Sequence, residues 1–230
     1  MLDFSGREAV VTGGTGALGR AVVKRLLAAG AIVHVPVYIS SELDDFPHRD
    51  DSNCHVHEDL DLRSEDDVER LYRAADSLYA SIHVAGGFDM GPIESTSRES
   101  WNHLVSMNAT TCFLCCREAA RSFGERGGRI VNVSARPVLV PTGQMSAYAA
   151  SKAAVAALTT TLSEELAPRG VWVNAVVPSI IDTPTNREAM PGADHAAWPT
   201  PEDIAETIAF LASPQNAVSR GALVPVYGRS

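Results

Sequence analysis

Four glycines lie between an apolar segment and an amphipathic helix near the start of the chain, and this arrangement constrains the fold more than any other feature. The apolar residues 9–12 predict a strand, and residues 18–29 predict a helix that ends at Gly30. The turn between them reads Thr12-Gly13-Gly14-Thr15-Gly16-Ala17-Leu18-Gly19. Glycines let a backbone turn tightly and approach a pyrophosphate, while the helix start directs free N–H groups and its positive dipole end at that anion. The pattern therefore predicts a dinucleotide site, with a purely structural glycine-rich turn as the alternative.

Short apolar, β-branched runs alternate with helical patterns along the rest of the chain. Strands are expected over residues 9–12, 32–37, 55–57, 82–85, 129–133, 171–177 and 223–226, and helices over residues 18–29, 64–78, 101–123, 147–166 and 201–212. This alternation, with continuously apolar strands, predicts a parallel sheet covered by helices on both faces. The expected fold class is α/β, with one doubly wound domain over residues 1–230 and about seven parallel strands. Pro36 and Pro225 are expected at strand ends or where the N–H is unpaired, and residues 40–51 as a solvated surface connection.

Composition excludes several classes of function. The chain has 230 residues and a net charge of −9, without a cluster of Lys and Arg, so it lacks the footprint of a nucleic-acid-binding protein. No run approaches the roughly 20 apolar residues of a membrane span. Residues 1–7 lack the basic and apolar regions of a signal peptide. We therefore expect a cytoplasmic protein with neither a nucleic-acid nor a membrane partner.

The four cysteines are Cys54, Cys112, Cys115 and Cys116, and three of them crowd one predicted helix, which is no disulfide framework. Their spacing could present thiols to a metal, but no partnering Cys-x-x-C lies elsewhere. We therefore expect buried, inert thiols and no metal. A similar argument applies to His55 and His57, which share one strand face without further evident ligands, so structural or surface roles are expected.

Tyr148 and Lys152 lie four residues apart at the start of a predicted helix, so the two side chains share one helix face. A phenol with a pKa of about 10 is a poor acid–base group at neutral pH. A nearby ammonium favours the phenolate, so we expect Lys152 and a positively charged nicotinamide to lower the pKa of Tyr148. The spacing Y-x-x-x-K is common by itself, but behind a glycine-turn unit it indicates proton transfer.

Together these segments resemble the short-chain dehydrogenase/reductase family, and the resemblance covers nearly the whole chain. Residues 12–19 match the coenzyme turn of that family, and Tyr148 and Lys152 match its acid–base pair. Asn108 resembles the family's catalytic asparagine, which positions a water and the lysine. The resemblance implies a Rossmann-type, NAD(P)-dependent oxidoreductase with Tyr148, Lys152 and Asn108 as its catalytic residues.

The resemblance also implies which residues hold the coenzyme. Asp61 and Leu62 resemble the pair that contacts adenine, and the segment Val84-Ala85-Gly86-Gly87 stands where the family has N-A-G. After the sixth strand, Ile181 would hold the nicotinamide carboxamide through its backbone and Thr183 through its hydroxyl. The implied coenzyme-binding residues are Gly13, Thr15, Gly16, Ala17, Leu18, Gly19, Asp61, Leu62, Ala85, Gly86, Tyr148, Lys152, Pro178, Ile181 and Thr183.

The chain departs from the family's pattern at several positions. Ala135 occupies the place of the catalytic serine, 13 residues before the tyrosine. Ser134 is adjacent, but neighbouring side chains along a strand face opposite ways, so we do not assign the role to it. His83 and Val84 replace the two asparagines of N-N-A-G, and Ser179 replaces a glycine.

Residues 182–198 also resemble the corresponding segment of the quinonoid dihydropteridine reductase branch, as do Val84-Ala85-Gly86-Gly87-Phe88 and the alanine at position 135. That branch uses tyrosine and lysine without the serine. A missing hydroxyl matters less when the substrate is conjugated and easily reduced, because less charge develops on one oxygen. The resemblance thus implies reduction of a small carbonyl, quinonoid or dihydropteridine-like substrate, beneath a flap at about residues 183–200. Phe88, Met190 and Trp198 are candidates to line the substrate pocket, and Arg136 to meet an anionic substrate.

Three questions stay open from sequence. An ordinary carbonyl or alcohol reductase, including a 3-oxoacyl reductase, is the first alternative, with Ser134, Thr142 or Ser146 as the missing donor; a non-catalytic dinucleotide sensor is the second. The second strand is followed by no adjacent acid or base, so the coenzyme is NAD(P)H with a slight preference for NADPH. In the resembling family the long helices 101–123 and 147–166 form the subunit interface, which implies a homodimer or homotetramer.

Overall fold

A seven-stranded parallel sheet forms the centre of the computed structural model, which describes residues 2–230. The strand order is β3-β2-β1-β4-β5-β6-β7, and all six pairings are parallel. The strands are β1 (Glu8–Thr12), β2 (Ile32–Pro36), β3 (Cys54–His57), β4 (Leu78–His83), β5 (Gly128–Val133), β6 (Val171–Pro178) and β7 (Leu223–Val226). The predicted α/β class, the parallel sheet and its seven strands are confirmed.

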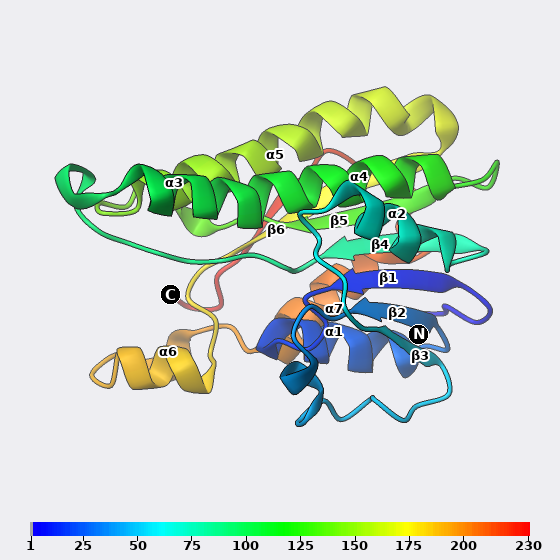
Figure 1. Cartoon of the computed structure of the whole chain (residues 1–230), viewed down its shortest axis with the longest axis horizontal. Helices are drawn as coiled ribbons and strands as arrows, with labels where there is room; N and C mark the ends of the chain where they lie inside the picture. Colours follow the sequence, from blue (N-terminus) through cyan, green and yellow to red (C-terminus); the bar gives the residue numbers. More distant parts are fainter. Residues whose placement is uncertain (1) are drawn as a thin grey trace.

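Helices cover both faces of this sheet, with α1 and α7 below it and α4 and α5 above it in Figure 1. The main helices are α1 (Ala17–Leu27), α2 (Glu65–Arg73), α3 (Arg98–Leu104), α4 (Thr111–Ser122), α5 (Ser146–Leu166), α6 (Pro184–Ala189) and α7 (Pro201–Ala212). One apolar core joins α1 and α7 to the sheet, and the other joins α2, α4 and α5 to its opposite face. The sheet is thus buried on both sides, which explains its continuously apolar strands.

The strand order reverses between β1 and β4, and this reversal positions the site. In parallel sheets of this kind, ligands bind beyond the carboxyl ends of the strands at the point of reversal. The glycine turn follows β1, and residues 84–87 follow β4, so both segments lie at that point. Pro36 ends β2, and Pro225 lies in the edge strand β7, which pairs only with β6. Both positions agree with the expectation for proline.

Two predicted boundaries are wrong. The helix expected over residues 64–78 ends at Arg73, because Leu78 already pairs with Glu8 in the sheet. The strand expected over residues 82–85 is β4, which begins at Leu78 and ends at His83, opposite the last residue of β1, Thr12. The chain beyond His83 then leaves the sheet and passes over the glycine turn.

The helix expected over residues 101–123 is two helices joined by a π-helical turn, Val105–Thr110. It begins at Arg98, because the Ser97 side chain accepts a hydrogen bond from the Ser100 N–H and caps the helix start. A π-helical turn contains an extra residue, so it shifts the helical phase; such turns are frequent at functional sites. Here the turn contains Asn108.

The connection after β2 is less solvated than expected. A 3₁₀ turn, Ser40–Leu43, begins it, and Leu43 and Phe46 are buried in the apolar core that includes α1. These two apolar side chains anchor the segment, so its acidic residues have fixed positions. Among the described residues, 2–230, no helix is both long and apolar enough to cross a membrane.

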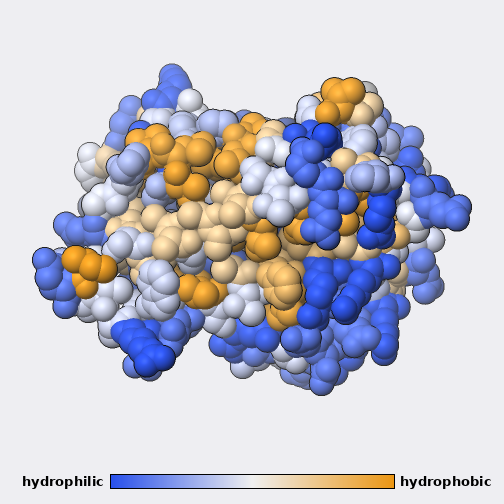
Figure 2. Space-filling model, turned by 90° about the horizontal axis from the view of Figure 1, so that it is seen from above, coloured by the Kyte–Doolittle hydropathy of each residue, from blue (hydrophilic) through white to orange (hydrophobic). Residues whose placement is uncertain are grey.

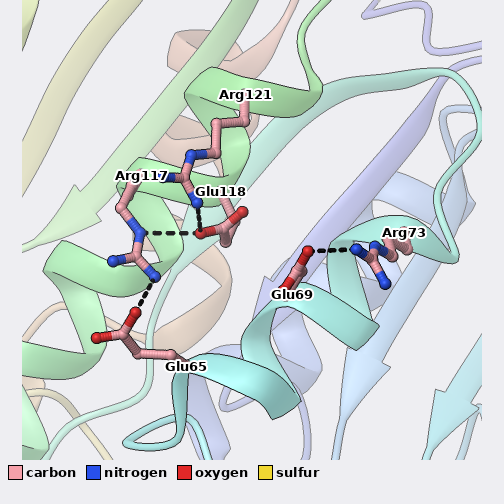
Figure 3. A network of polar contacts seen from close by, with 6 residues as sticks. All are labelled: Glu65, Glu69, Arg73, Arg117, Glu118 and Arg121. Atoms are coloured by element: carbon pink, nitrogen blue, oxygen red, sulfur yellow. Dashed lines mark hydrogen bonds and ion pairs between the residues drawn. The ribbon is translucent and has the colours of Figure 1, made fainter.

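Ion pairs connect α2 with α4 above the sheet (Figure 3). The Arg117 guanidinium contacts the Glu65 carboxylate at 2.8 Å and the Glu118 carboxylate at 2.9 Å, and Arg121 shares Glu118. The Glu118 side chain is buried, whereas Glu65 is exposed. An exposed pair contributes little to stability, but the two arginines neutralise the buried carboxylate of Glu118. The network therefore neutralises a buried charge within α4, and its one link to α2, the Glu65–Arg117 pair, lies at the surface.

Candidate active site

A cleft of about 660 Å³ lies at the carboxyl ends of β1, β2 and β4. It is lined by most of the residues that the resemblance assigns to the coenzyme, namely Gly13, Thr15, Gly16, Ala17, Leu18, Gly19, Asp61, Leu62, Ala85 and Gly86. Segments more than 70 residues apart in the sequence thus line one cleft. Its shape and chemistry can be compared with what a dinucleotide requires.

Glycine is required at two positions of the turn. Gly13 has a φ of +63°, and a Cβ there would lie 2.8 Å from the Ala85 nitrogen. A Cβ on Gly19 would lie 1.9 Å from the Gly13 carbonyl oxygen. Helix α1 begins directly after Gly16, with no side chain capping its N-terminus. Its first N–H groups are therefore available to an anion, and the residues present fit the pyrophosphate of a dinucleotide.

The adenosine end of the cleft contains a carboxylate that the sequence argument missed. Glu42 lines the cleft, and its Oε2 accepts a hydrogen bond of 2.6 Å from the Thr15 hydroxyl. Two arginines also line this end, but each has a partner: Arg63 pairs with Asp61, and the Arg20 Nε donates to the Thr15 carbonyl. The Arg63 guanidinium holds the pKa of the Asp61 carboxyl below its usual value. Glu42 is six residues beyond the end of β2, outside the segment where such an acid is normally sought.

Asn108 is buried in the π-helical turn and contacts two other segments. Its Oδ1 accepts from the Gly87 N–H at 2.9 Å, and its Nδ2 donates to the Gly87 carbonyl at 3.0 Å and to the Ser151 hydroxyl at 2.9 Å. Ser151 in turn donates to the Tyr148 carbonyl. Asn108 therefore ties the loop after β4 to the first turns of α5. Sequence reasoning missed Ser151, because its only signal was its place between Tyr148 and Lys152.

Lys152 converges with Asn108 on Gly86. A Cβ on Gly86 would lie 2.5 Å from Asn108 Oδ1 and 3.1 Å from Lys152 Nζ, so only glycine fits between them. The Lys152 ammonium also donates to the Val133 carbonyl at 2.9 Å. Burial lowers the pKa of Lys152 to about 8.

The pKa of Tyr148 departs from the sequence expectation in direction. Burial raises it to about 12, whereas the neighbouring lysine was expected to lower it. The physical reason is desolvation, which disfavours the phenolate, while the Lys152 ammonium is directed to a carbonyl. In the protein alone, Tyr148 is thus a protonated phenol, the form that donates a proton. Its ring packs nearly perpendicular to the Phe88 ring, at 79°, with centroids 4.9 Å apart.

Three hydroxyls are the sequence candidates to replace the serine that is missing at position 135. Ala135 is buried, and the adjacent Ser134 hydroxyl donates to the Lys152 carbonyl at 3.0 Å. The Ser134 hydroxyl is therefore occupied by a hydrogen bond to the backbone of α5. The Thr142 hydroxyl is exposed and donates to the Val140 carbonyl. Ser146 begins α5 and lines a smaller cavity of about 230 Å³ beside Ala147.

The expected nicotinamide segment follows β6. Thr183 caps α6, since its hydroxyl accepts from the Asn186 N–H at 3.2 Å, and the Asn186 side chain donates to the Ile181 carbonyl. Pro178 is the last residue of β6. None of Pro178, Ile181 and Thr183 lines the 660 Å³ cleft, so these three residues lie outside the part that the glycine turn forms.

Of the candidate substrate-pocket residues, Phe88 packs against Tyr148. Trp198 is buried and packs against His195, 4.7 Å between ring centroids, and Met190 lies at the end of α6. The Arg136 guanidinium lies 5.3 Å from the Tyr227 ring centroid. Within the part of the chain that the structure describes, Arg136 forms no ion pair, and its buried Nε has no hydrogen-bond partner.

Comparison with known proteins places this geometry in a family. The family model described as short chain dehydrogenase matches residues 7–194. The chain is 31% identical to 3beta-hydroxysteroid dehydrogenase 1 of Eggerthella lenta, over 98% of this chain and 94% of that one. It is 28% identical to the 3-oxoacyl-[acyl-carrier-protein] reductase FabG of Rickettsia felis, over 99% and 98% of the two chains.

Solved structures agree with these matches. A short-chain dehydrogenase/reductase of Brucella melitensis, titled as a glucose/ribitol dehydrogenase, superposes with a TM-score of 0.91 at 28% identity, over 99% of this chain and 97% of that one. One from Mycobacterium ulcerans gives a TM-score of 0.90 at 25% identity, over 99% and 90% of the chains. The relatives and the solved structures match almost the full length of this chain, and the family model matches residues 7–194. The chain therefore belongs to the short-chain dehydrogenase family and is an oxidoreductase.

Proposed function

We propose that this protein is a reductase of small conjugated carbonyl compounds, with a quinonoid or dihydropteridine-like substrate, and that Tyr148 is its proton donor. The coenzyme, NADH or NADPH, supplies hydride when it is bound. The protein's own residues bind and orient the reactants and deliver the proton. The observation that carries the proposal is that Asn108 and Lys152 meet at Gly86, that Ser151 joins Asn108 to the Tyr148 backbone, and that Ala135 occupies the serine position.

Each residue of the assembly has a defined task. Tyr148, protonated because burial raises its pKa, donates the phenolic proton to the reduced substrate. Lys152, whose ammonium donates to the Val133 carbonyl in the protein alone, would turn toward the phenol to stabilise the phenolate that remains. Asn108 fixes the loop at Gly87 relative to α5, so the tyrosine and lysine keep their positions.

The alanine at position 135 selects the class of substrate. A plain ketone concentrates negative charge on one oxygen during reduction, and a second hydroxyl donor normally stabilises that charge. Here the Ser134 hydroxyl already donates its hydrogen bond to the Lys152 carbonyl, and the Ala135 side chain has no hydrogen-bond donor. A conjugated acceptor spreads the charge over its ring system, so it requires this donor less.

Apolar side chains near Tyr148 suit a flat ring. Phe88 is 60% exposed and packs against the Tyr148 ring, and Met90 is 51% exposed. Exposed apolar side chains beside a polar reacting group are typical of a site that binds an apolar ring. We propose that residues 183–200 form the flap that closes over this ring, within one domain spanning the chain.

An ordinary carbonyl reductase is the second candidate, and one observation favours it. Ser146 lies two residues before Tyr148 and lines the 230 Å³ cavity, where its hydroxyl could approach a bound carbonyl. The relatives named as a hydroxysteroid dehydrogenase and a 3-oxoacyl reductase act on isolated carbonyl or hydroxyl groups.

For the coenzyme, we propose a preference for NADH. The slight preference for NADPH expected from sequence depends on the absence of a carboxylate after β2. Glu42 supplies one to the cleft, where it can accept a hydrogen bond from a ribose hydroxyl and would repel a 2′-phosphate. The neighbouring Arg63 is neutralised by Asp61.

We also propose that a second copy of the chain covers the face formed by α4 and α5. Figure 2 shows a broad apolar band across the side of the molecule on which these helices lie, between hydrophilic margins. A groove of about 510 Å³ between the two helices is lined by Phe113, Leu158 and Leu162, with Arg117, Glu165 and Arg169 around it. An apolar strip with charges of both signs at its rim is complementary to itself under two-fold symmetry.

A substrate panel tests the proposed function. The purified protein is offered a quinonoid dihydropterin, a set of quinones and 3-oxoacyl thioesters with each coenzyme, and coenzyme oxidation is followed. The proposal predicts that kcat/KM for the best quinonoid substrate exceeds that for any thioester by at least about 100-fold, the effect of one oxyanion donor. Turnover confined to the thioesters contradicts it and supports the Ser146 alternative.

A further inference from the structure

Three buried side chains that the proposed reaction does not use converge behind the active site. His83 ends β4, and Cys112 and Cys116 lie one turn apart on α4. Their ligand atoms, one imidazole nitrogen and two sulfurs, all lie within 4.8 Å of one another. The two Sγ atoms are 3.9 Å apart, and Cys116 Sγ is 3.6 Å from His83 Nδ1.

These separations agree with those between ligands of one metal ion. Zinc binds sulfur at about 2.3 Å and imidazole nitrogen at about 2.0 to 2.1 Å, so on a tetrahedral ion the ligand atoms lie about 3.8 Å (S to S) and about 3.6 Å (S to N) apart. The cluster therefore has the size of a coordination shell.

A fourth donor atom lies at the same point. Asn132 Oδ1, on β5, is 2.7 Å from His83 Nδ1, 3.4 Å from Cys112 Sγ and 3.6 Å from Cys116 Sγ. Its amide nitrogen donates to the Thr159 hydroxyl, which fixes the oxygen toward the cluster. Three donor groups thus point at one carbonyl oxygen, which has only two lone pairs. A cation bound by all four atoms would replace these hydrogen bonds, and His83 Nδ1 and Asn132 Oδ1 would move from 2.7 Å to the separation of about 3.3 Å that two such ligands have on zinc.

The surroundings of His83 also suit a metal ligand. Its other nitrogen, Nε2, lies 2.8 Å from the Ser81 hydroxyl and 3.2 Å from the Tyr72 hydroxyl. Imidazoles that bind a metal through one nitrogen usually donate from the other to such a partner, which fixes the ring. On binding, both thiol protons would pass to solvent, and the imidazole would carry its single proton on Nε2.

We propose that His83, Cys112, Cys116 and Asn132 form a binding site for a divalent thiophilic cation, with zinc as the first choice. The charge of a divalent ion equals that of two thiolates, so the complex is neutral, which lowers the cost of burying it. The site would join β4, β5 and α4 and is structural, because its four donors leave no open position. The proposal runs against the sequence expectation of inert thiols and no metal. It does not depend on the proposed reaction.

Metal content tests this proposal on the folded protein. Because the site is buried, the ion must enter during folding, so the protein is produced in zinc-supplemented medium and dialysed, and zinc is counted by mass spectrometry. We expect about one zinc per chain in the wild type, and at least a 10-fold loss in Cys112→Ser and in Cys116→Ser. Cys115→Ser is the matched control: that cysteine is buried on the same helix, outside the cluster, and the variant should keep its zinc.

Absorption spectra of cobalt-substituted protein provide a second test that stays valid if a variant folds poorly. Protein produced with cobalt should show the sulfur-to-cobalt charge-transfer band in the near ultraviolet and the strong visible bands of a four-coordinate ion. His83→Asn, which introduces the residue the resembling family has at this position, should remove the nitrogen ligand and shift these bands. Wild-type protein without bound zinc and without a charge-transfer band overturns the proposal, and so does zinc binding that Cys112→Ser and Cys116→Ser leave unchanged.

Discussion

At the scale of single residues, the reactivity of the site depends on which hydroxyls are free. Ser134 is one residue away from the place of the usual donor, yet its hydroxyl is held by the Lys152 carbonyl, and Ala135 contributes only a methyl group. Tyr148 remains the proton donor, and burial keeps its pKa high. A residue's chemistry here is therefore set by its hydrogen-bond partner as much as by its type.

Ala135→Ser tests this statement. Restoring the hydroxyl should raise kcat/KM for a plain ketone by at least about 10-fold, since a single oxyanion donor contributes about 100-fold or more in sites built for it. The same substitution should change kcat/KM for a quinonoid substrate by less than about 2-fold, because that substrate spreads its charge. Steady-state kinetics with both substrates measure the two effects. An equal gain for both substrates would show that position 135 does not determine the class of substrate.

Glu42→Gln tests the carboxylate at the adenosine end. Removing its charge should lower the ratio of kcat/KM for NADH to that for NADPH by at least about 10-fold, because specificity here is achieved by repulsion of the 2′-phosphate. Asp44→Asn is the matched control, since it removes the same charge from an exposed residue outside the cleft. If the two variants behave alike, Glu42 has no specific role in coenzyme choice.

At the scale of elements, two features bring the site together. The π-helical turn Val105–Thr110 shifts the helical phase so that Asn108 meets Gly87 and Ser151. The turn after β2 carries Glu42 into the cleft because Leu43 and Phe46 anchor it in the core. Neither feature produces a periodic pattern of apolar residues in the sequence, so neither could be predicted without the structure.

The neighbouring strands β2 and β3 predict a pH dependence of stability. Burial lowers the pKa of His57 to about 4, and the rings of His34 and His55 disfavour its charge further. The folded protein therefore binds its proton less readily than the unfolded chain, whose histidine pKa is about 6.5. Stability is complete above pH 6.5 and falls as the pH drops toward 4, by about 1 to 2 kcal/mol after allowance for partial exposure.

Urea denaturation of the wild type and His57→Asn between pH 7 and pH 4.5 measures this contribution. The variant should lose less free energy of unfolding over that range, while His48→Asn, on the connection before β3, should lose as much as the wild type. Parallel pH profiles for the wild type and His57→Asn would contradict the assignment.

At the scale of the whole molecule, much of the fold could be predicted and part of the site could not. Continuous apolar runs such as residues 171–177 predicted a sheet buried on both faces, and the glycine turn predicted a dinucleotide site, where the structure has the cleft. Long-range hydrogen bonds carry no such pattern. Ser151 and Glu42 were missed because each acts on a residue tens of positions away.

The same scale includes assembly. If a second copy covers the groove between α4 and α5, Leu158→Glu buries an unpaired charge in the interface and should convert the protein to monomers. Light scattering after size-exclusion chromatography measures the mass. Phe210→Glu, an exposed position on α7 across the sheet, is the control and should leave the assembly intact. A Leu158→Glu mass equal to that of the wild type would exclude this face as the interface.

The central claim is that Tyr148 delivers the proton, and its removal tests this most directly. Coenzyme oxidation with the best substrate of the panel is compared between wild type and Tyr148→Phe, with Tyr79→Phe as a half-buried control away from the cleft. The account predicts that kcat falls by about 10²- to 10⁴-fold in Tyr148→Phe, with coenzyme affinity retained, and is unchanged in Tyr79→Phe. Equal kcat values in Tyr148→Phe and the wild type would contradict it.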